Sequence, residues 1–330
     1  MSRFEEFRFP SADQSSSVYV RCCLPDGPVR GTLQLTHGIA EYIQRYDPLM
    51  QFLADEGWAV YGNDHIGHGQ TAQHLGYVGE HSGWSVMVSD MVTLHRTVVQ
   101  RHPHVPHFLF GHSMGSFLAR TFIIKYGSVL DGCILSGTAH PPKTMIMGAK
   151  VLAALEVKRH GAGYHSPLLQ SVMNGQYNGG YDNPRTAFDW ISSDPNMVDA
   201  YIADPLCGTV PTAGLVSEVL RGMLFITNRR NIEKMSPDLP VFFISGADDP
   251  VGELSHGVIR AYRSFLKAKV QDVSLQLYPG LRHEILNDVG KGEVMDDILC
   301  WLNEEPGEIE IPVKMQVTRD WTERPHGALL

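Results

Sequence analysis

Residues 108–115 read F-L-F-G-H-S-M-G, and a run with a helical apolar period follows at residues 117–126. The three apolar residues at the start suit a strand that is buried on both faces. A strand, a G-x-S-x-G turn and a helix form the setting of a nucleophile elbow, in which Gly111 and Gly115 permit a tight turn and the hydroxyl of Ser113 stays exposed. The N-terminus of the helix favours negative charge that develops beside it. The alternative is a turn of small residues that carries no chemistry.

Short apolar runs recur on both sides of this segment, and segments with a helical period separate them. The helical period is clearest between Trp84 and Val98, before Pro103. Because helices that bury both faces of a strand make it continuously apolar, the pattern predicts an α/β fold with a mostly parallel central sheet flanked by helices. Residues 4–10 and 17–23 predict an antiparallel hairpin at one edge. The expected parallel strands lie at residues 33–35, 58–61, 108–110, 133–135, 241–244 and 273–278.

The alternation of strands and helices stops between residues 139 and 234, where the sequence is helical and rich in loops. An apolar stretch covers residues 145–157, and a second helix candidate runs from Leu215 to Met223. We interpret residues 139–234 as an inserted helical cap, and residues 1–138 and 235–330 as the core domain. The alternative is a second independent domain, but neither flank alone supplies a complete sheet. The tail after Glu304 shows no clear period.

A serine hydroxyl is a poor nucleophile until a base takes its proton. In a sheet with a nucleophile elbow, an acid and then a histidine follow, each just after a late strand. The run 241–245 is followed by G-A-D-D-P, and the run 273–278 is followed by P-G-L-R-H. We therefore expect His283 to act as the base for Ser113, with Asp248 or Asp249 holding its imidazole.

A tetrahedral intermediate needs two hydrogen-bond donors aimed at its oxygen. One donor should be the backbone N–H of the residue after the nucleophile, Met114. The other should come from the loop that follows the early strand, which reads His37, Gly38, Ile39. We assign the second donor to the backbone N–H of Ile39.

Asp64, His65 and His68 are candidate metal ligands because they lie close together in the chain. Their stretch, N-D-H-I-G-H-G-Q-T, is a loop punctuated by glycine, and no distant ligand set accompanies it. We predict buried hydrogen bonding near the rim of the site, and neither a metal nor a cofactor. Cys207, in D-P-L-C-G, lacks a positioned base, so we interpret it as a structural or pocket-lining thiol.

Charge and cysteine content limit the class of protein. The net charge is −9 and Lys and Arg form no block, so we expect no nucleic-acid partner. Five cysteines without metal-ligand spacing indicate reduced thiols in the cytoplasm. Residues 1–10 lack the apolar centre of a signal peptide, and no stretch approaches the roughly 20 apolar residues of a membrane span. We expect a soluble cytoplasmic protein without an obligate protein partner.

Taken together, the motifs resemble the monoacylglycerol lipase and lysophospholipase family of serine hydrolases, which has the α/β-hydrolase fold. The likeness runs from about residue 31 to 301. In that family the acid is the third residue after the glycine, which implies Asp249, and a helical cap admits single acyl chains. The cap segments D-W-I-S-S-D and D-P-L-C-G-T-V-P-T look like those of bacterial members labelled lysophospholipases. The motifs are, in order, H-G-I-A-E-Y with Arg45 and Tyr46, D-H-I-G-H-G-Q-T, G-H-S-M-G, G-A-D-D-P-V and Y-P-G-L-R-H-E.

The resemblance implies a serine carboxylic-ester hydrolase that cleaves monoacylglycerol, lysophospholipid or comparable esters, with transient membrane or micelle contact through the cap. One alternative is an aminopeptidase or C–C hydrolase on the same triad. An acidic cap would favour the aminopeptidase, whereas the apolar residues 145–157 favour acyl chains. Another alternative is a non-catalytic ligand-binding protein of this fold, which the complete triad argues against. Dehalogenase and epoxide hydrolase chemistry is excluded because it needs an aspartate in place of Ser113.

Overall fold

An eight-stranded sheet runs through the molecule in the order β1-β2-β4-β3-β5-β6-β7-β8. The computed structural model describes residues 2–179, 181 and 183–304, so the tail after Glu304 lies outside the described residues. The strands from β4 to β8 in this order are parallel, and the β1–β2 hairpin adds to β4 in the antiparallel sense. The predicted mostly parallel sheet is thereby confirmed. The strands are β1 (Arg3–Pro10), β2 (Ser17–Leu24), β3 (Gly31–Thr36), β4 (Trp58–Asn63), β5 (His107–His112), β6 (Gly132–Ser136), β7 (Val241–Gly246) and β8 (Val273–Tyr278).

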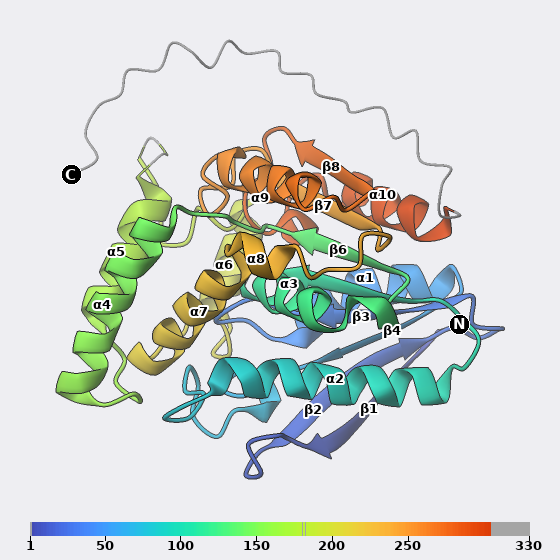
Figure 1. Ribbon diagram of the computed structural model, residues 1–330, viewed down its shortest axis with the longest axis horizontal. Coiled ribbons are helices and arrows are strands. Elements are labelled where there is room, and N and C mark those ends of the chain that lie inside the picture. The colour runs from blue at the N-terminus through green and yellow to red at the C-terminus, as the bar shows by residue number, and fades with distance from the viewer. Residues whose placement is uncertain (1, 180, 182, 305–330) are drawn as a thin grey trace.

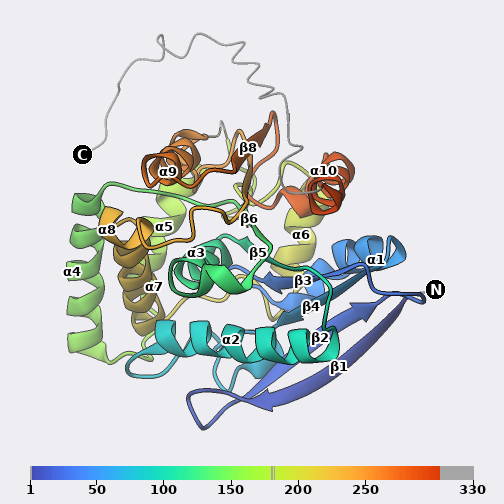
Figure 2. The same ribbon diagram turned by 45° about the vertical axis from the view of Figure 1, so that its right-hand side comes forward.

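Helices cover both faces of the sheet, as the continuous apolar runs require (Figures 1 and 2). On one face, α2 (Gly83–Arg101), α3 (Met114–Tyr126) and α9 (His256–Lys267) pack against alternate strand residues, among them Leu109. On the other face, α1 (Asp47–Asp55) and α10 (Lys291–Asn303) pack against Phe108 and Phe110. Each large apolar side chain buried in this way stabilises the fold by about 1.5–3 kcal/mol. Both faces of β5 are therefore packed in the hydrophobic core, and this packing holds in place the strand that ends just before Ser113.

Five helices lie between β6 and β7 in the part of this segment that the structure describes. Four of them begin at a residue whose side chain accepts a hydrogen bond from a first-turn N–H, which explains where they start: Ser166, Asp194, Thr212 and Asn228. In Figure 1, α4, α5 and α7 lie together at the left of the sheet. The division into a core domain and a helical cap stays a prediction. The end of the segment between β6 and β7 packs into the main hydrophobic cluster through Ile226 and Ile232. The helices are α4 (Lys143–His160), α5 (Pro167–Asn178), α6 (Pro195–Ala203), α7 (Ala213–Ile226) and α8 (Arg229–Ile232).

Among the described residues, none of the helices combines the length and the apolar character needed to cross a bilayer.

Candidate active site

Ser113 occupies the turn between β5 and α3, with a φ of 52° and a ψ of −121°. A non-glycine residue rarely adopts a positive φ, and such strain is typical of functional turns. A Cβ atom at Gly115 would lie 2.1 Å from the carbonyl oxygen of Thr36, and one at Gly111 would lie 2.5 Å from the carbonyl oxygen of Gly115. Only glycine fits at either position, as the sequence predicts. The helix begins at Met114, earlier than its apolar period indicates, so Ser113 itself is the N-cap.

Asp249 and His283 meet at the carboxyl ends of β7 and β8. His283 Nδ1 donates a hydrogen bond of 2.9 Å to Asp249 Oδ2, and both side chains are buried. Burial by itself lowers the pKa of His283, but the charge and hydrogen bond of Asp249 outweigh it, so the net pKa is raised above the ordinary 6.5. Asp248 is exposed, and its backbone N–H donates to the carbonyl oxygen of Leu281. The structure thus pairs Asp249, not Asp248, with the imidazole.

The imidazole of His283 packs between two aromatic rings. Its centroid lies 4.7 Å from that of His112, which immediately precedes Ser113, and 5.2 Å from that of Trp190. A Cβ atom at Gly137 would lie 3.1 Å from the Cε1 atoms of both histidines, so a glycine is needed between β6 and these rings. Burial, followed by the charge of His283, lowers the pKa of His112, which keeps that ring neutral.

The loop after β3 passes beside the nucleophile. A Cβ atom at Gly38 would lie 3.1 Å from the Cβ atom of Ser113. Ile39 and Met114 line the same cavity as Ser113. Within the described part of the chain, the backbone N–H groups of Ile39 and Met114 donate to no protein acceptor. Both groups are therefore available to an oxygen atom bound there.

Buried histidines hold this loop in place. The N–H of His65 donates to Nε2 of His37 over 3.0 Å, so the proton of His37 is on Nδ1, which donates to the carbonyl oxygen of Gly38 over 2.8 Å. Nε2 of His65 lies 2.9 Å from the hydroxyl of Thr36. Burial, followed by the charge of His68, lowers the pKa of His65 to about 3, so the ring stays neutral.

Asp64 and His68 also make hydrogen bonds that hold their loop. Asp64 accepts the backbone N–H groups of Ile43 and Gln70, and His68 Nδ1 lies 3.0 Å from the carbonyl oxygen of Ile66. In the residues that the structure describes, no group of three or more His, Cys, Asp or Glu is arranged to hold a metal. Asp64 connects the loop after β4 to the loop after β3.

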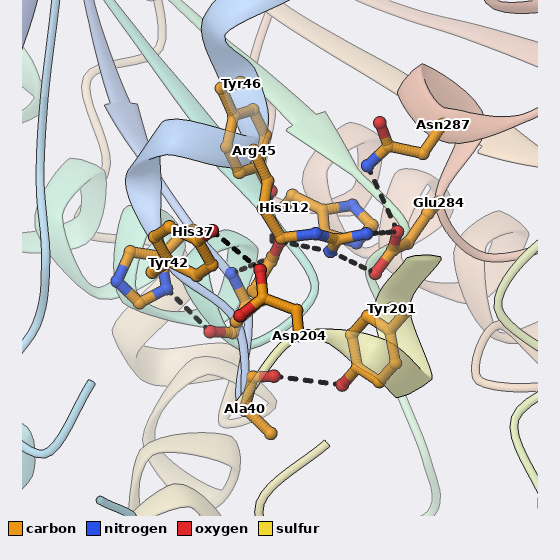
Figure 3. A network of polar contacts seen from close by, with 12 residues as sticks. His37, Ala40, Tyr42, Arg45, Tyr46, His112, Tyr201, Asp204, Glu284 and Asn287 are labelled. Carbon is orange, nitrogen blue, oxygen red and sulfur yellow. Dashed lines mark hydrogen bonds and ion pairs between the residues drawn. The ribbon is translucent and has the colours of Figure 1, made fainter. Parts of the chain in front are cut away.

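A charged clamp, Glu41–Arg45–Glu284, joins the loop after β3 to the segment that begins at His283. Figure 3 shows its Arg45–Glu284 pair. Arg45 makes hydrogen bonds of 2.7 and 2.6 Å to the two carboxylate oxygens of Glu284, and one of 2.9 Å to Glu41. Glu41 also accepts the N–H of Gly38, next to Ile39. Burial raises the pKa of Glu41 to about 7, opposed by Arg45. The clamp thus positions the neighbours of both Ile39 and His283.

Sequence analysis missed this clamp, although its residues stand within the quoted motifs. Arg45 and Glu284 are 239 positions apart, and no local period connects them. The available signal was a glutamate directly after His283 and another within H-G-I-A-E-Y. Two acids and one base in otherwise apolar, glycine-rich surroundings require partners, because an unpaired buried charge is costly.

A cavity of about 480 Å³ opens at Ser113. Leu152, in the apolar stretch 145–157, is among its lining residues, whereas Cys207 is not. Cys207 packs with Ile191 and Tyr201, and burial raises the pKa of its thiol, so it is a structural residue. Apolar side chains from α3, α4, α5 and α7 form most of the wall, among them Phe117, Met145, Ile146, Leu152, Leu169, Val172, Val216, Val219, Leu220 and Met223.

A mostly parallel sheet with a serine at the turn after β5 and an acid–histidine pair after β7 and β8 defines a serine hydrolase of the α/β-hydrolase fold. Residues 27–290 match the family described as serine aminopeptidase, S33, and the chain belongs to that family. The resemblance to monoacylglycerol lipases is confirmed by relatives that cover most of the chain.

A monoacylglycerol lipase from Mycolicibacterium smegmatis is 28% identical over 280 residues, which is 84% of this chain and 90% of the relative. The monoglyceride lipase of Homo sapiens is 26% identical and covers 87% of each chain. The crystal structure of a thermostable carboxyl esterase from Bacillus coagulans, in complex with glycerol, superimposes with a TM-score of 0.84 at 30% identity. That superposition covers 91% of this chain and 98% of the esterase.

Proposed function

We propose that this protein hydrolyses the ester bond of monoacyl lipids, monoacylglycerols or lysophospholipids, through an acyl-enzyme on Ser113. The observation that carries the proposal is the apolar cavity of about 480 Å³ with Ser113 in its wall. Such a volume is in the range of small-molecule sites, and its mostly apolar lining suits one acyl chain. The monoacylglycerol and monoglyceride lipases among the relatives support the same substrate class.

In the proposed mechanism the hydroxyl oxygen of Ser113 attacks the ester carbonyl while Nε2 of His283 takes its proton. The backbone N–H groups of Ile39 and Met114 stabilise the oxyanion. His283 then protonates the leaving alcohol, and Asp249 holds the imidazole with its proton on Nδ1. Water, deprotonated by His283, attacks the acyl-enzyme and releases the fatty acid and the free serine.

The pH profile tests the role of His283. The base must be neutral to accept a proton, so kcat/KM should rise with pH through the pKa of His283, which lies above the ordinary 6.5. Asp249→Asn removes the charge that raises this pKa, so the residual activity of the variant should have its acidic limb at lower pH. The measurement is kcat/KM for a p-nitrophenyl ester between pH 5 and 9, with spontaneous hydrolysis subtracted. An acidic limb that does not move in the variant would contradict the assignment.

The length of the acyl chain should control activity. Each methylene buried in the cavity contributes about 0.8 kcal/mol, so kcat/KM should rise roughly fourfold per CH₂ until the cavity is full, then level or fall. Leu152→Asp places a charge in the wall and should depress long-chain esters more than acetate. Ala154→Asp is the matched control, because Ala154 is an exposed residue of the same helix that does not line the cavity. A p-nitrophenyl ester series is the measurement, followed by monoacylglycerols and lysophospholipids. Flat activity from acetate to laurate would mean that the lipid assignment is wrong.

An aminopeptidase on the same triad is the second candidate, because the family description carries that name. A free amine in the substrate would need an unpaired carboxylate in the cavity. Among the lining residues that the structure describes, the one carboxylate is Glu253, and it pairs with Arg260. The cavity therefore favours the ester substrate. Preference for amino-acyl amides over esters of equal length would reverse this choice, and turnover of either substrate would exclude a non-catalytic ligand-binding role.

We propose transient contact with a membrane or micelle through α4. Its outward residues Met147, Val151 and Leu155 are 51, 62 and 57% exposed, and Lys150 and Lys158 accompany them. This arrangement suits an interfacial helix on an anionic surface. The protein should sediment with phosphatidylglycerol vesicles, and Val151→Glu with Leu155→Glu should reduce binding severalfold without lowering activity on soluble acetate. Equal binding of both forms would contradict the contact.

We also propose a cytoplasmic location. All five cysteines are free thiols, which is typical of a reducing compartment. Recovery of the native protein with the secreted or periplasmic fraction would contradict the proposal.

A further inference from the structure

Arg120 is a fully buried cation on the helix that follows Ser113. It is the largest of the fully buried side chains, with no exposed surface. Within the described residues its hydrogen-bond partners include no carboxylate, and burial lowers its pKa to about 9. An arginine in such surroundings is costly, and packing alone would be served better by an apolar side chain of similar volume. Its hydrogen bonds must therefore explain why an arginine stands here.

The guanidinium donates to two segments that are far apart in the chain. The first is the segment that leaves β6, where Arg120 donates to the Thr138 hydroxyl (3.3 Å), the Ala139 carbonyl oxygen (2.7 Å) and Nδ1 of His140 (3.1 Å). The second is the end of α7, where it donates to the carbonyl oxygen of Ile226 over 3.2 Å. One side chain of α3 thus contacts both the start of the segment between β6 and β7 and the end of α7.

The charges of the neighbours suit this arrangement. The last carbonyl groups of α7 lack helical partners and carry the negative end of the helix dipole, so a cation at Ile226 is favourable. Burial, and then the charges of Arg120 and Arg260, lower the pKa of His140 to about 3, so that ring is neutral and accepts at Nδ1. The positive charge is offset by these dipoles and by the ring of Phe265, whose centroid lies 5.8 Å from the guanidinium carbon, rather than by a carboxylate.

Arg120 does not line the cavity, but its partners belong to segments that do. Ala139, whose carbonyl oxygen accepts a hydrogen bond from Arg120, lines the cavity. Met223, in the last turn of α7, lines it as well. Phe117, also a lining residue, lies one turn before Arg120 on α3. A shift of either segment away from α3 would change the width of the cavity next to Ser113.

We propose that Arg120 is a positioning residue that holds residues 138–140 and the end of α7 against the nucleophile helix, and so sets the shape of the acyl cavity. The expected change in ester kinetics rests on the proposed ester hydrolysis, whereas the expected change in hydrogen exchange does not. Lysine cannot replace it fully, because one ammonium group cannot spread its donors over both segments as the planar guanidinium does.

Three variants test the proposal: Arg120→Met, Arg120→Lys and Arg263→Met, the last being a matched control because Arg263 is an exposed arginine on α9. The first measurement is hydrogen–deuterium exchange. Arg120→Met should increase exchange in residues 138–146 and 220–227 at least tenfold while β5 stays protected, with Arg120→Lys intermediate and Arg263→Met unchanged. Exchange that stays at the wild-type level in both segments, or that rises equally in β5, overturns the proposal.

The second measurement separates the positioning role from simple loss of fold. For Arg120→Met, kcat/KM should fall about tenfold for p-nitrophenyl laurate through KM, and less than threefold for p-nitrophenyl acetate. Equal losses for both esters overturn the proposal. If Arg120→Met fails to fold, the same comparison is made with Arg120→Lys, for which the difference between the losses for laurate and acetate should be smaller. Absence of ester hydrolysis in the wild-type protein would refute the proposed function, while the exchange experiment would still decide the role of Arg120.

Discussion

Ser113→Ala is expected to lower kcat for ester hydrolysis about 10⁶-fold and to abolish labelling by a fluorophosphonate probe. The physical reason is that the turn after β5 places this one hydroxyl at the wall of the apolar cavity, beside the N-terminus of α3. Without a nucleophile, only substrate binding and oxyanion stabilisation remain, which leaves a small residual rate over water. The measurement is single-turnover hydrolysis of a p-nitrophenyl ester, with circular dichroism to check the fold.

Ser116→Ala is the matched control for this experiment. Ser116 is buried one turn further along α3, and its hydroxyl donates to the backbone carbonyl oxygen of Ser113 rather than facing substrate. This variant should keep its labelling, with a modest loss of rate. Labelling that persists in Ser113→Ala would falsify the assignment of the nucleophile.

Asp249→Asn is expected to lower kcat about 10⁴-fold, as the equivalent change does in a serine protease with the same triad chemistry. Asp249 Oδ2 accepts the proton on Nδ1 of His283, and its Oδ1 accepts the N–H of Val251. An asparagine at this place can present an N–H to the imidazole, which favours the wrong tautomer and no longer stabilises the positive ring. The loss should appear in kcat rather than in KM, because the ground-state complex does not need the charge.

Asp248→Asn is the control, and its effect should be less than tenfold. The Asp248 side chain is exposed, and the hydrogen bonds of the residue come from its backbone: its N–H donates to Leu281, and its carbonyl oxygen accepts the hydroxyl of Tyr181. Neither bond depends on the carboxylate. If Asp248→Asn proved the more damaging of the two, the choice of acid would be wrong, although the nucleophile and the base would stand.

The sequence by itself determined the architecture of the sheet and the position of the serine turn after β5. A strand buried on both faces must be apolar throughout, and β3, β4, β5, β6 and β7 are buried at every position. The elbow was equally readable, because its two glycines and its serine stand within five consecutive residues between an apolar strand and a helical period. A local pattern therefore records the elbow, although the backbone that leaves no room for a Cβ atom at position 115 is that of Thr36 on β3.

The sequence also located the histidine and the acid to within one residue. Parallel strands end at the same edge of a sheet, so residues that follow them meet there. The choice between Asp248 and Asp249 was different. The pattern of residues left it open, the family resemblance implied Asp249, and the structure pairs that residue with His283.

Only the tertiary structure decided which distant side chains meet. The Arg45–Glu284 pair joins residues 239 positions apart, and Arg120 reaches both Ala139 and Ile226 from α3. No period or spacing encodes these contacts, because they depend on how whole elements pack and on which buried charges then find partners. The shape of the cavity has the same origin: Leu152 faces it while Val151 faces outward, and that difference follows from how α4 packs against α7.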